Sequence, residues 1–165
     1  LYRKCVPLST VEAIYKRYAS TMRAVIQAND TVYIFSETTY LQTHIDSFED
    51  LKGGHIYGIS MAAPDEKTAS EAAAEINEVP PNTKNDFQNM THIDVVPAGC
   101  SKGIGVEVVR KAFGVKEMYG IGDSYNDLPL LESVDHPYTL NHAPQQIKDA
   151  AEGVVSSVSE LLDRI

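Results

Sequence analysis

Tyr119-Gly-Ile-Gly-Asp-Ser-Tyr-Asn-Asp-Leu-Pro-Leu-Leu131 concentrates the polar chemistry of this chain between two apolar segments. The apolar run from Met118 to Ile121 predicts a short buried strand, and Gly122 lets the backbone turn tightly after it. Helical spacing resumes at Leu128, with a proline in the first turn, where a helix tolerates proline well. The stretch therefore predicts a strand, a polar loop and a helix in succession.

The polar loop carries two carboxylates, Asp123 and Asp127, with a hydroxyl and an amide between them. It follows the carboxyl end of a strand, where open α/β sheets bind ligands. Oxygen ligands of this kind suit Mg²⁺, which takes one or two carboxylates together with phosphate and water. A calcium loop starting at Asp123 is excluded, because Tyr125 and Leu128 stand where it needs an acidic or amide residue and a glycine.

Helical and strand patterns alternate through the rest of the chain. The patterns predict helices over 11–28, 64–77, 104–113, 144–151 and 158–165, and strands over 31–35, 55–61, 92–96, 138–140 and 153–155. Residues 37–52 are ambiguous, with weak helical spacing, and Pro80-Pro81-Asn82 is a predicted loop. This alternation implies an α/β fold with a parallel sheet.

The composition is that of a globular protein with an acidic surface. The 165 residues include 23 acidic and 14 basic side chains, a formal charge of -9 that disfavours nucleic acid and anionic membranes as partners. No apolar run approaches the roughly 20 residues that a membrane span needs. The two cysteines, Cys5 and Cys100, fit neither a metal spacing nor a dense disulfide framework, so reduced thiols in the cytoplasm are expected.

Two short motifs resemble those of one enzyme family. Residues 122–127, Gly-Asp-Ser-Tyr-Asn-Asp, resemble the fourth motif of the haloacid dehalogenase (HAD) superfamily, GDxxND, and Ser101-Lys102-Gly103 resembles its third. Together they resemble the Cof-type branch of the HAD phosphatases. The resemblance implies the C-terminal part of a HAD-like Rossmann-type core with an α/β cap domain. Residues 1–8 would be a link from the core, 9–95 the cap and 96–165 the core.

The resemblance also assigns roles to individual residues. Lys102 would be catalytic, neutralising charge between the nucleophile and the bound phosphoryl group. Without the resemblance, the sequence favours an ordinary solvated lysine at this position. Asp123 matches the metal-binding carboxylate, and Asp127 a second acidic position that is catalytic and supports the metal site or holds its waters. We expect Asp123→Asn to cost far more activity than Asp127→Asn. Asn126 matches a residue that faces the phosphate or orders the loop.

The resemblance is less specific for three further residues, which are Asn141 and His142 in the next predicted turn and Ser124 in the polar loop. Asn141-His142-Ala143-Pro144 resembles the family's Asn-Ala-Pro turn near the site, but His142 stands where the asparagine usually does and Asn141 one place early. Either side chain is a candidate for substrate binding. Ser124 is expected to brace the backbone rather than to act as a nucleophile, since no histidine lies near it in the motif.

The family's first motif, DxD after an apolar strand, is absent from this sequence. The resemblance therefore implies a fragment that lacks the nucleophile, is inactive by itself, and is prone to self-association. The intact enzyme would hydrolyse a small phosphorylated metabolite through an aspartyl-phosphate with Mg²⁺ as cofactor. Two alternatives stay open: a phosphomutase of the same superfamily, and a non-catalytic binding or regulatory module on the HAD fold.

Overall fold

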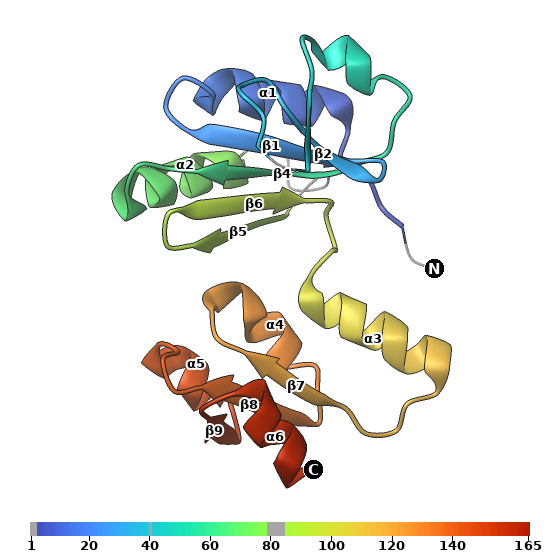
Figure 1. Cartoon of the computed structure of the whole chain (residues 1–165), viewed down its shortest axis with the longest axis vertical. Coiled ribbons are helices and arrows are strands. Elements are labelled where there is room, and N and C mark those ends of the chain that lie inside the picture. The colour runs from blue at the N-terminus through green and yellow to red at the C-terminus, as the bar shows by residue number, and fades with distance from the viewer. Residues whose placement is uncertain (1–2, 40, 79–84) are drawn as a thin grey trace. The chain divides into compact units, whose positions relative to one another are not determined.

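The computed structural model describes residues 3–39, 41–78 and 85–165, and the chain divides into two compact units, Leu1–Gly99 and Cys100–Ile165 (Figure 1). The loop predicted at Pro80-Pro81-Asn82 lies outside the described residues. Within the described residues, no helix combines the length and the apolarity needed to cross a bilayer.

The first unit is built on a six-stranded sheet in the order β3-β2-β1-β4-β6-β5. Its strands are β1 Arg23–Ala28, β2 Thr31–Ile34, β3 Gln42–His44, β4 Ile56–Ala62, β5 Asn85–Asn89 and β6 His92–Val96. Neighbouring strands are antiparallel except β2 and β3. The predicted parallel sheet is therefore wrong for this unit. For β1 and β2 the physical reason is the short connection, since Asn29 and Asp30 alone join them, which suits a hairpin and is too short for a parallel crossover.

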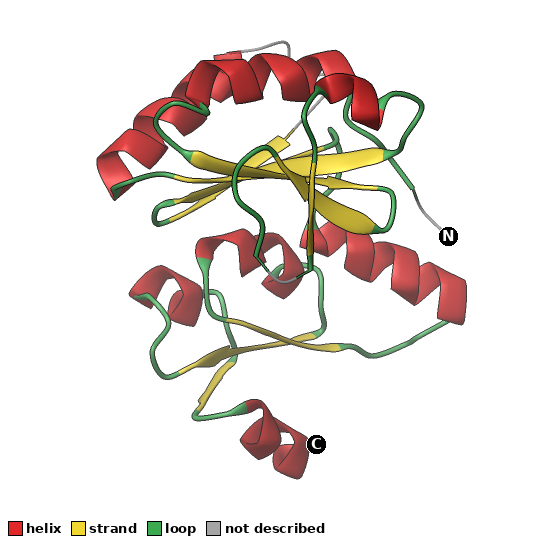
Figure 2. Ribbon diagram, turned by 45° about the horizontal axis from the view of Figure 1, so that its top comes forward, coloured by secondary structure: helices red, strands yellow, loops and turns green. Residues whose placement is uncertain are grey.

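Helices cover one face of this sheet (Figure 2). They are α1 Leu8–Tyr18 and α2 Glu66–Glu78, with a short 3-10 helix, η1, over Phe48–Leu51. One continuous apolar core joins the helices to the sheet, and it includes Val11 of α1, Ile76 of α2 and Ile59 of β4, each at most 1% exposed. Burial of this face stabilises the unit in the usual way of a two-layer α/β fold.

The helix predicted over 11–28 is wrong in its second half. The helix α1 ends at Tyr18, and the residues Arg23–Ala28 form strand β1 instead. Burial alternates along β1, with Ala24, Ile26 and Ala28 buried, and the strand pairs with β4 along its whole length. In the ambiguous segment 37–52, the structure has strand β3 and η1 in place of a helix.

The second unit contains a three-stranded parallel sheet in the order β7-β8-β9. Its strands are β7 Tyr119–Gly122, β8 His136–Leu140 and β9 Gly153–Val155, and its helices are α3 Lys102–Phe113, α4 Leu128–Leu131, α5 Gln145–Asp149 and α6 Val158–Arg164, with the 3-10 helix η2 over Tyr125–Asp127. Here the predicted parallel pairing is confirmed. Helix α3 ends as predicted at Gly114, whose φ of 64° is left-handed.

Candidate active site

The polar loop follows directly after Gly122, the last residue of β7. An added Cβ on Gly122 would lie 2.5 Å from the Cβ of Asp127, so the position has room only for glycine. Asp123 and Ser124 follow, and η2 then places Asp127 back against the end of the strand. As a result, Asp127 is only 7% exposed although it belongs to a loop.

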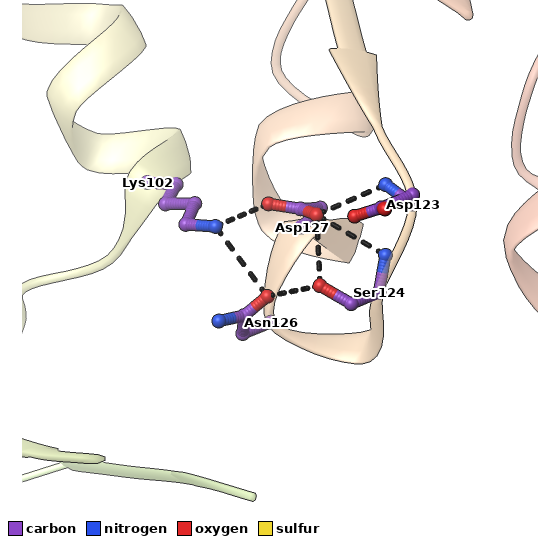
Figure 3. Close-up of polar contacts among 5 residues, drawn as sticks. All are labelled: Lys102, Asp123, Ser124, Asn126 and Asp127. Atoms are coloured by element: carbon purple, nitrogen blue, oxygen red, sulfur yellow. Dashed lines mark hydrogen bonds and ion pairs between the residues drawn. The ribbon is translucent and has the colours of Figure 1, made fainter. Parts of the chain in front are cut away.

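Asp127 is the centre of the hydrogen-bond network in this loop (Figure 3). Its Oδ2 accepts the backbone N–H of Asp123 at 3.0 Å and that of Ser124 at 3.1 Å, and the Ser124 hydroxyl lies 3.0 Å from the same oxygen. Its Oδ1 accepts from the ammonium group of Lys102. Both carboxylate oxygens are therefore engaged by donors of the protein itself, which satisfies a largely buried charge.

The surroundings of Asp127 act on its pKa in opposite directions. Burial raises the pKa of Asp127 and is the largest single effect, but the hydrogen bonds from Lys102, from the Asp123 N–H and from Ser124 together outweigh it. The pKa of Asp127 consequently lies below its ordinary value. The carboxylate is ionised at neutral pH, which suits it to hold a cationic side chain and makes it a poor proton donor.

Lys102 reaches this network from the first turn of α3. The hydroxyl of Ser101 accepts the N–H of Ile104 at 3.1 Å and so caps the helix as predicted. Gly103 lets the helix approach α4 closely, because a Cβ at that position would lie 2.2 Å from the carbonyl oxygen of Pro129. The Lys102 ammonium also lies 3.4 Å from Oδ1 of Asn126, and its side chain stays 47% exposed.

Asp123 joins this network through its backbone N–H, which donates to Asp127, while its carboxylate contacts a histidine. Its side chain is 44% exposed, and its Oδ2 lies 2.8 Å from Nε2 of His142, in the turn after β8. Of the two candidates in that turn, it is thus His142 that contacts the cluster. Asn141 is exposed and donates its backbone N–H to the Val155 carbonyl, and the described residues show no hydrogen bond from its side chain to the cluster.

The arrangement offers a phosphate ester two kinds of contact. Lys102 and Asn126 present a cation and an amide, and Asp123 of the same loop as Asn126 presents a partly exposed carboxylate. This donor set fits Mg²⁺, which can take a single protein carboxylate and complete its coordination with phosphate and water. Asp127 differs from Asp123 in that both its carboxylate oxygens already accept hydrogen bonds from the protein.

Sequence reasoning missed two features of this site. One is the contact between Asp123 and His142, which depends on β7 and β8 being neighbours and has no signal in the spacing. The other is the close approach of α3 at Gly103. A glycine inside a helix costs up to about 1 kcal/mol relative to alanine, but α3 also contains Gly105, which has no close neighbour, so the sequence did not indicate which glycine marks the contact.

A sequence model of the haloacid dehalogenase-like hydrolase family matches residues 8–161. Among relatives, YkrA of Bacillus subtilis is 24% identical over 173 residues, which cover 97% of this chain and 65% of YkrA. The 5-amino-6-(5-phospho-D-ribitylamino)uracil phosphatase YwtE of the same bacterium is 30% identical over 70 residues, which cover 41% of this chain and 24% of YwtE. The chain thus spans less than two thirds of the length of each of these relatives.

Solved structures resemble the whole chain at the level of the fold. SMU.1108c from Streptococcus mutans has a TM-score of 0.84 at 15% identity, covering 99% of this chain and 70% of that one. BT4131, a sugar phosphatase of HAD subclass IIB, has a TM-score of 0.78 at 15% identity, covering 99% and 68%. The predicted α/β class and HAD-like fold are confirmed.

Proposed function

The chain belongs to the haloacid dehalogenase-like hydrolase family, and we propose that it forms part of a phosphatase, which releases phosphate from a small phosphorylated metabolite. The observation that carries the proposal is the cluster at the carboxyl end of β7, where Lys102, Asn126 and Asp123 are brought together around the buried Asp127. The name of the relative YwtE, a phosphatase of a phosphorylated metabolite, supports the substrate class.

In this proposal, Lys102 and Asn126 bind the oxygens of the phosphoryl group. The ammonium group of Lys102 would offset the negative charge that gathers as a carboxylate approaches phosphorus. Asp127 would keep Lys102 in place and hold the loop through its backbone hydrogen bonds, which its low pKa supports. His142 and Asn141 stay candidates for substrate contact, with His142 favoured because it reaches the cluster.

Asp123 would hold the Mg²⁺ ion, with Asp127 in support. When bound, the cation supplies charge that screens the phosphoryl oxygens and orients the group. The protein's own part is to present one exposed carboxylate on a loop whose backbone is fixed at Asp123 N–H and Ser124 N–H. A loop held in this way orients the carboxylate before any ligand arrives.

We further propose that the attacking carboxylate, which would form an aspartyl-phosphate, is not among the clustered residues of this chain. Asp127 has both oxygens engaged, and Asp123 is assigned to the cation. A covalent route needs a carboxylate that faces phosphorus and is free to attack it. The present chain alone is therefore expected to bind phosphate without turning over an ester.

The proposed division of labour follows the two compact units. Residues 9–95 would act as a cap that selects the substrate and excludes water, with 1–8 as a link and 96–165 as the C-terminal part of the core. The units Leu1–Gly99 and Cys100–Ile165 support this split.

The proposed location is the cytoplasm. Self-association is proposed because Ile104, Val109 and Phe113 of α3 expose apolar surface.

The proposal is tested by assaying the complete gene product for hydrolysis of a panel of small phosphomonoesters with Mg²⁺. We expect activity that falls by about 10²-fold or more in Lys102→Ala, because a preorganised charge at the phosphoryl group is lost. Lys111→Ala, an exposed lysine of the same helix, is the matched control and should keep full activity. Transfer of the phosphate to a second substrate hydroxyl would favour a phosphomutase, and no activity on any ester would favour a binding module.

A further inference from the structure

The Asp123–His142 pair joins two loops at one edge of the second sheet. Asp123 follows β7 and His142 follows β8, and these strands are parallel neighbours with Gly122 opposite Thr139 (Figure 1). The turn that carries His142 is fixed by the next residue, because Ala143 is 4% exposed and donates its N–H to the Leu140 carbonyl. The imidazole therefore projects from an anchored backbone.

The separation of the two polar atoms matches that of two ligands on one cation. Nε2 of His142 lies 2.8 Å from Oδ2 of Asp123. Two neighbouring vertices of an octahedron with bonds of about 2.1 Å are about 3.0 Å apart. A cation could thus be bound by both atoms with a small movement of the side chains. Both side chains are accessible, at 69% exposed for His142 and 44% for Asp123.

From this geometry we propose that His142 is a second protein ligand of the cation at Asp123, and that it makes the site favour Mn²⁺ and other first-row transition-metal ions over Mg²⁺. The inference rests on the metal site of the proposed function. Its chemical basis is ligand type, since imidazole is a common ligand of transition metals whereas Mg²⁺ is bound almost entirely by oxygen. One nitrogen beside one carboxylate therefore shifts the selectivity of the site.

A simpler role for His142 would be to donate a hydrogen bond that orients the Asp123 carboxylate. The two roles predict different behaviour of an asparagine at this position. The side-chain amide of asparagine can also donate a hydrogen bond, but it offers a cation only a carbonyl oxygen. His142→Asn should keep an orienting role largely intact, and it should abolish a preference that depends on a nitrogen ligand.

The test is a cation titration of the full chain, labelled with ¹⁵N and held at constant neutral pH. Paramagnetic broadening of the backbone amide signals of the loops after β7 and β8 reports Mn²⁺ binding, and competition with Mg²⁺ gives the ratio of the two affinities. We expect this ratio to fall about tenfold or more in His142→Asn. His55→Asn, an exposed histidine of the other unit, should leave it unchanged.

The variants separate failure of this inference from failure of the proposed function. An unchanged affinity ratio in His142→Asn, or an absence of broadening in the wild-type loops, overturns the role of His142. Wild-type binding of both cations by Asp123→Asn would overturn the metal site itself. The amide spectrum of each variant shows whether it is folded, and His142→Gln, which carries the same functional group on a longer side chain, should behave as His142→Asn does.

Discussion

Asp123 and Asp127 differ in what surrounds their carboxylates, although they lie four residues apart on one loop. Asp127 is buried and its carboxylate accepts from Lys102 and from two backbone N–H groups, whereas the carboxylate of Asp123 is partly exposed and lies within hydrogen-bond distance of His142. The first arrangement holds a loop together, and the second leaves a carboxylate available to a ligand. Position in the network, rather than residue type, separates the two roles.

Gly103 and Gly105 offer a matched pair of substitutions within α3. Alanine at Gly103 would overlap the Pro129 carbonyl and the Ser133 hydroxyl, whereas alanine at Gly105 meets nothing within 4 Å. We expect Gly103→Ala to lower the free energy of unfolding by about 1–3 kcal/mol through overpacking. Gly105→Ala should raise it by about 0.5–1 kcal/mol, because alanine favours the helix. Urea unfolding measures both, and equal effects would contradict the close approach of α3 to α4.

Several single residues were predictable because their signals are local. The Ser101 cap and the end of α3 at Gly114 are confirmed, since each depends on hydrogen bonds within a few residues. The direct pairing of Lys102 with Asp127 was not predicted, although both residues were singled out. That pairing depends on how α3 packs against α4, which the chain determines over long range.

Among the strands and helices, the errors come from long-range pairing. Met22, just before β1, and Val25 and Ile26 within it fit a helical repeat, so periodicity alone could not distinguish a helix from a strand here. Pairing with β4 makes this segment a strand, because six residues of β1 pair with residues of β4. The parallel strands β7, β8 and β9 were predictable, because a helical segment separates each from the next and provides the crossover.

His136 links the amino-terminal ends of the three strands in the second sheet. Its Nε2 lies 2.9 Å from Glu117, just before β7, and its Nδ1 lies 3.1 Å from Glu152, just before β9. Its ring also stacks on Tyr119 with centroids 4.4 Å apart. The hydrogen bond to Glu117 raises the pKa of His136 most, burial opposes this, and Glu152 raises it further, so the net direction is upward.

A raised pKa makes this link dependent on pH. The protonated form is stabilised in the folded state, so the contribution is complete below the ordinary pKa of about 6.5 and is lost as pH rises through the higher folded value. We expect the wild type to be more stable than His136→Gln at about pH 6, and the difference to shrink by about pH 9. Thermal unfolding at both pH values checks this. A difference that does not change with pH would contradict the ion pairs.

Across the whole chain, the sequence was sufficient for the class of fold and for the family. Both follow from features that are visible in a single sequence, namely the alternation of helices and strands and the motif from Gly122 to Asp127. The assignment of residues 9–95 as a cap stays a prediction, because the motifs lie in the other unit. The identity of the substrate also has to come from experiment. No sequence motif in the first unit identifies the residues that would contact the substrate.

We propose that Asp123 holds the cation while Asp127 holds the loop. The most direct measurement compares Asp123→Asn and Asp127→Asn in the complete gene product, recording Mg²⁺-dependent phosphomonoester hydrolysis and the free energy of unfolding for each. Asp123→Asn should lose about 10²-fold or more of the activity with unfolding unchanged, because only a ligand of the cation is removed. Asp127→Asn should lose less activity and about 1–3 kcal/mol of stability, because buried donors lose a charged acceptor. Wild-type activity in Asp123→Asn would contradict the claim.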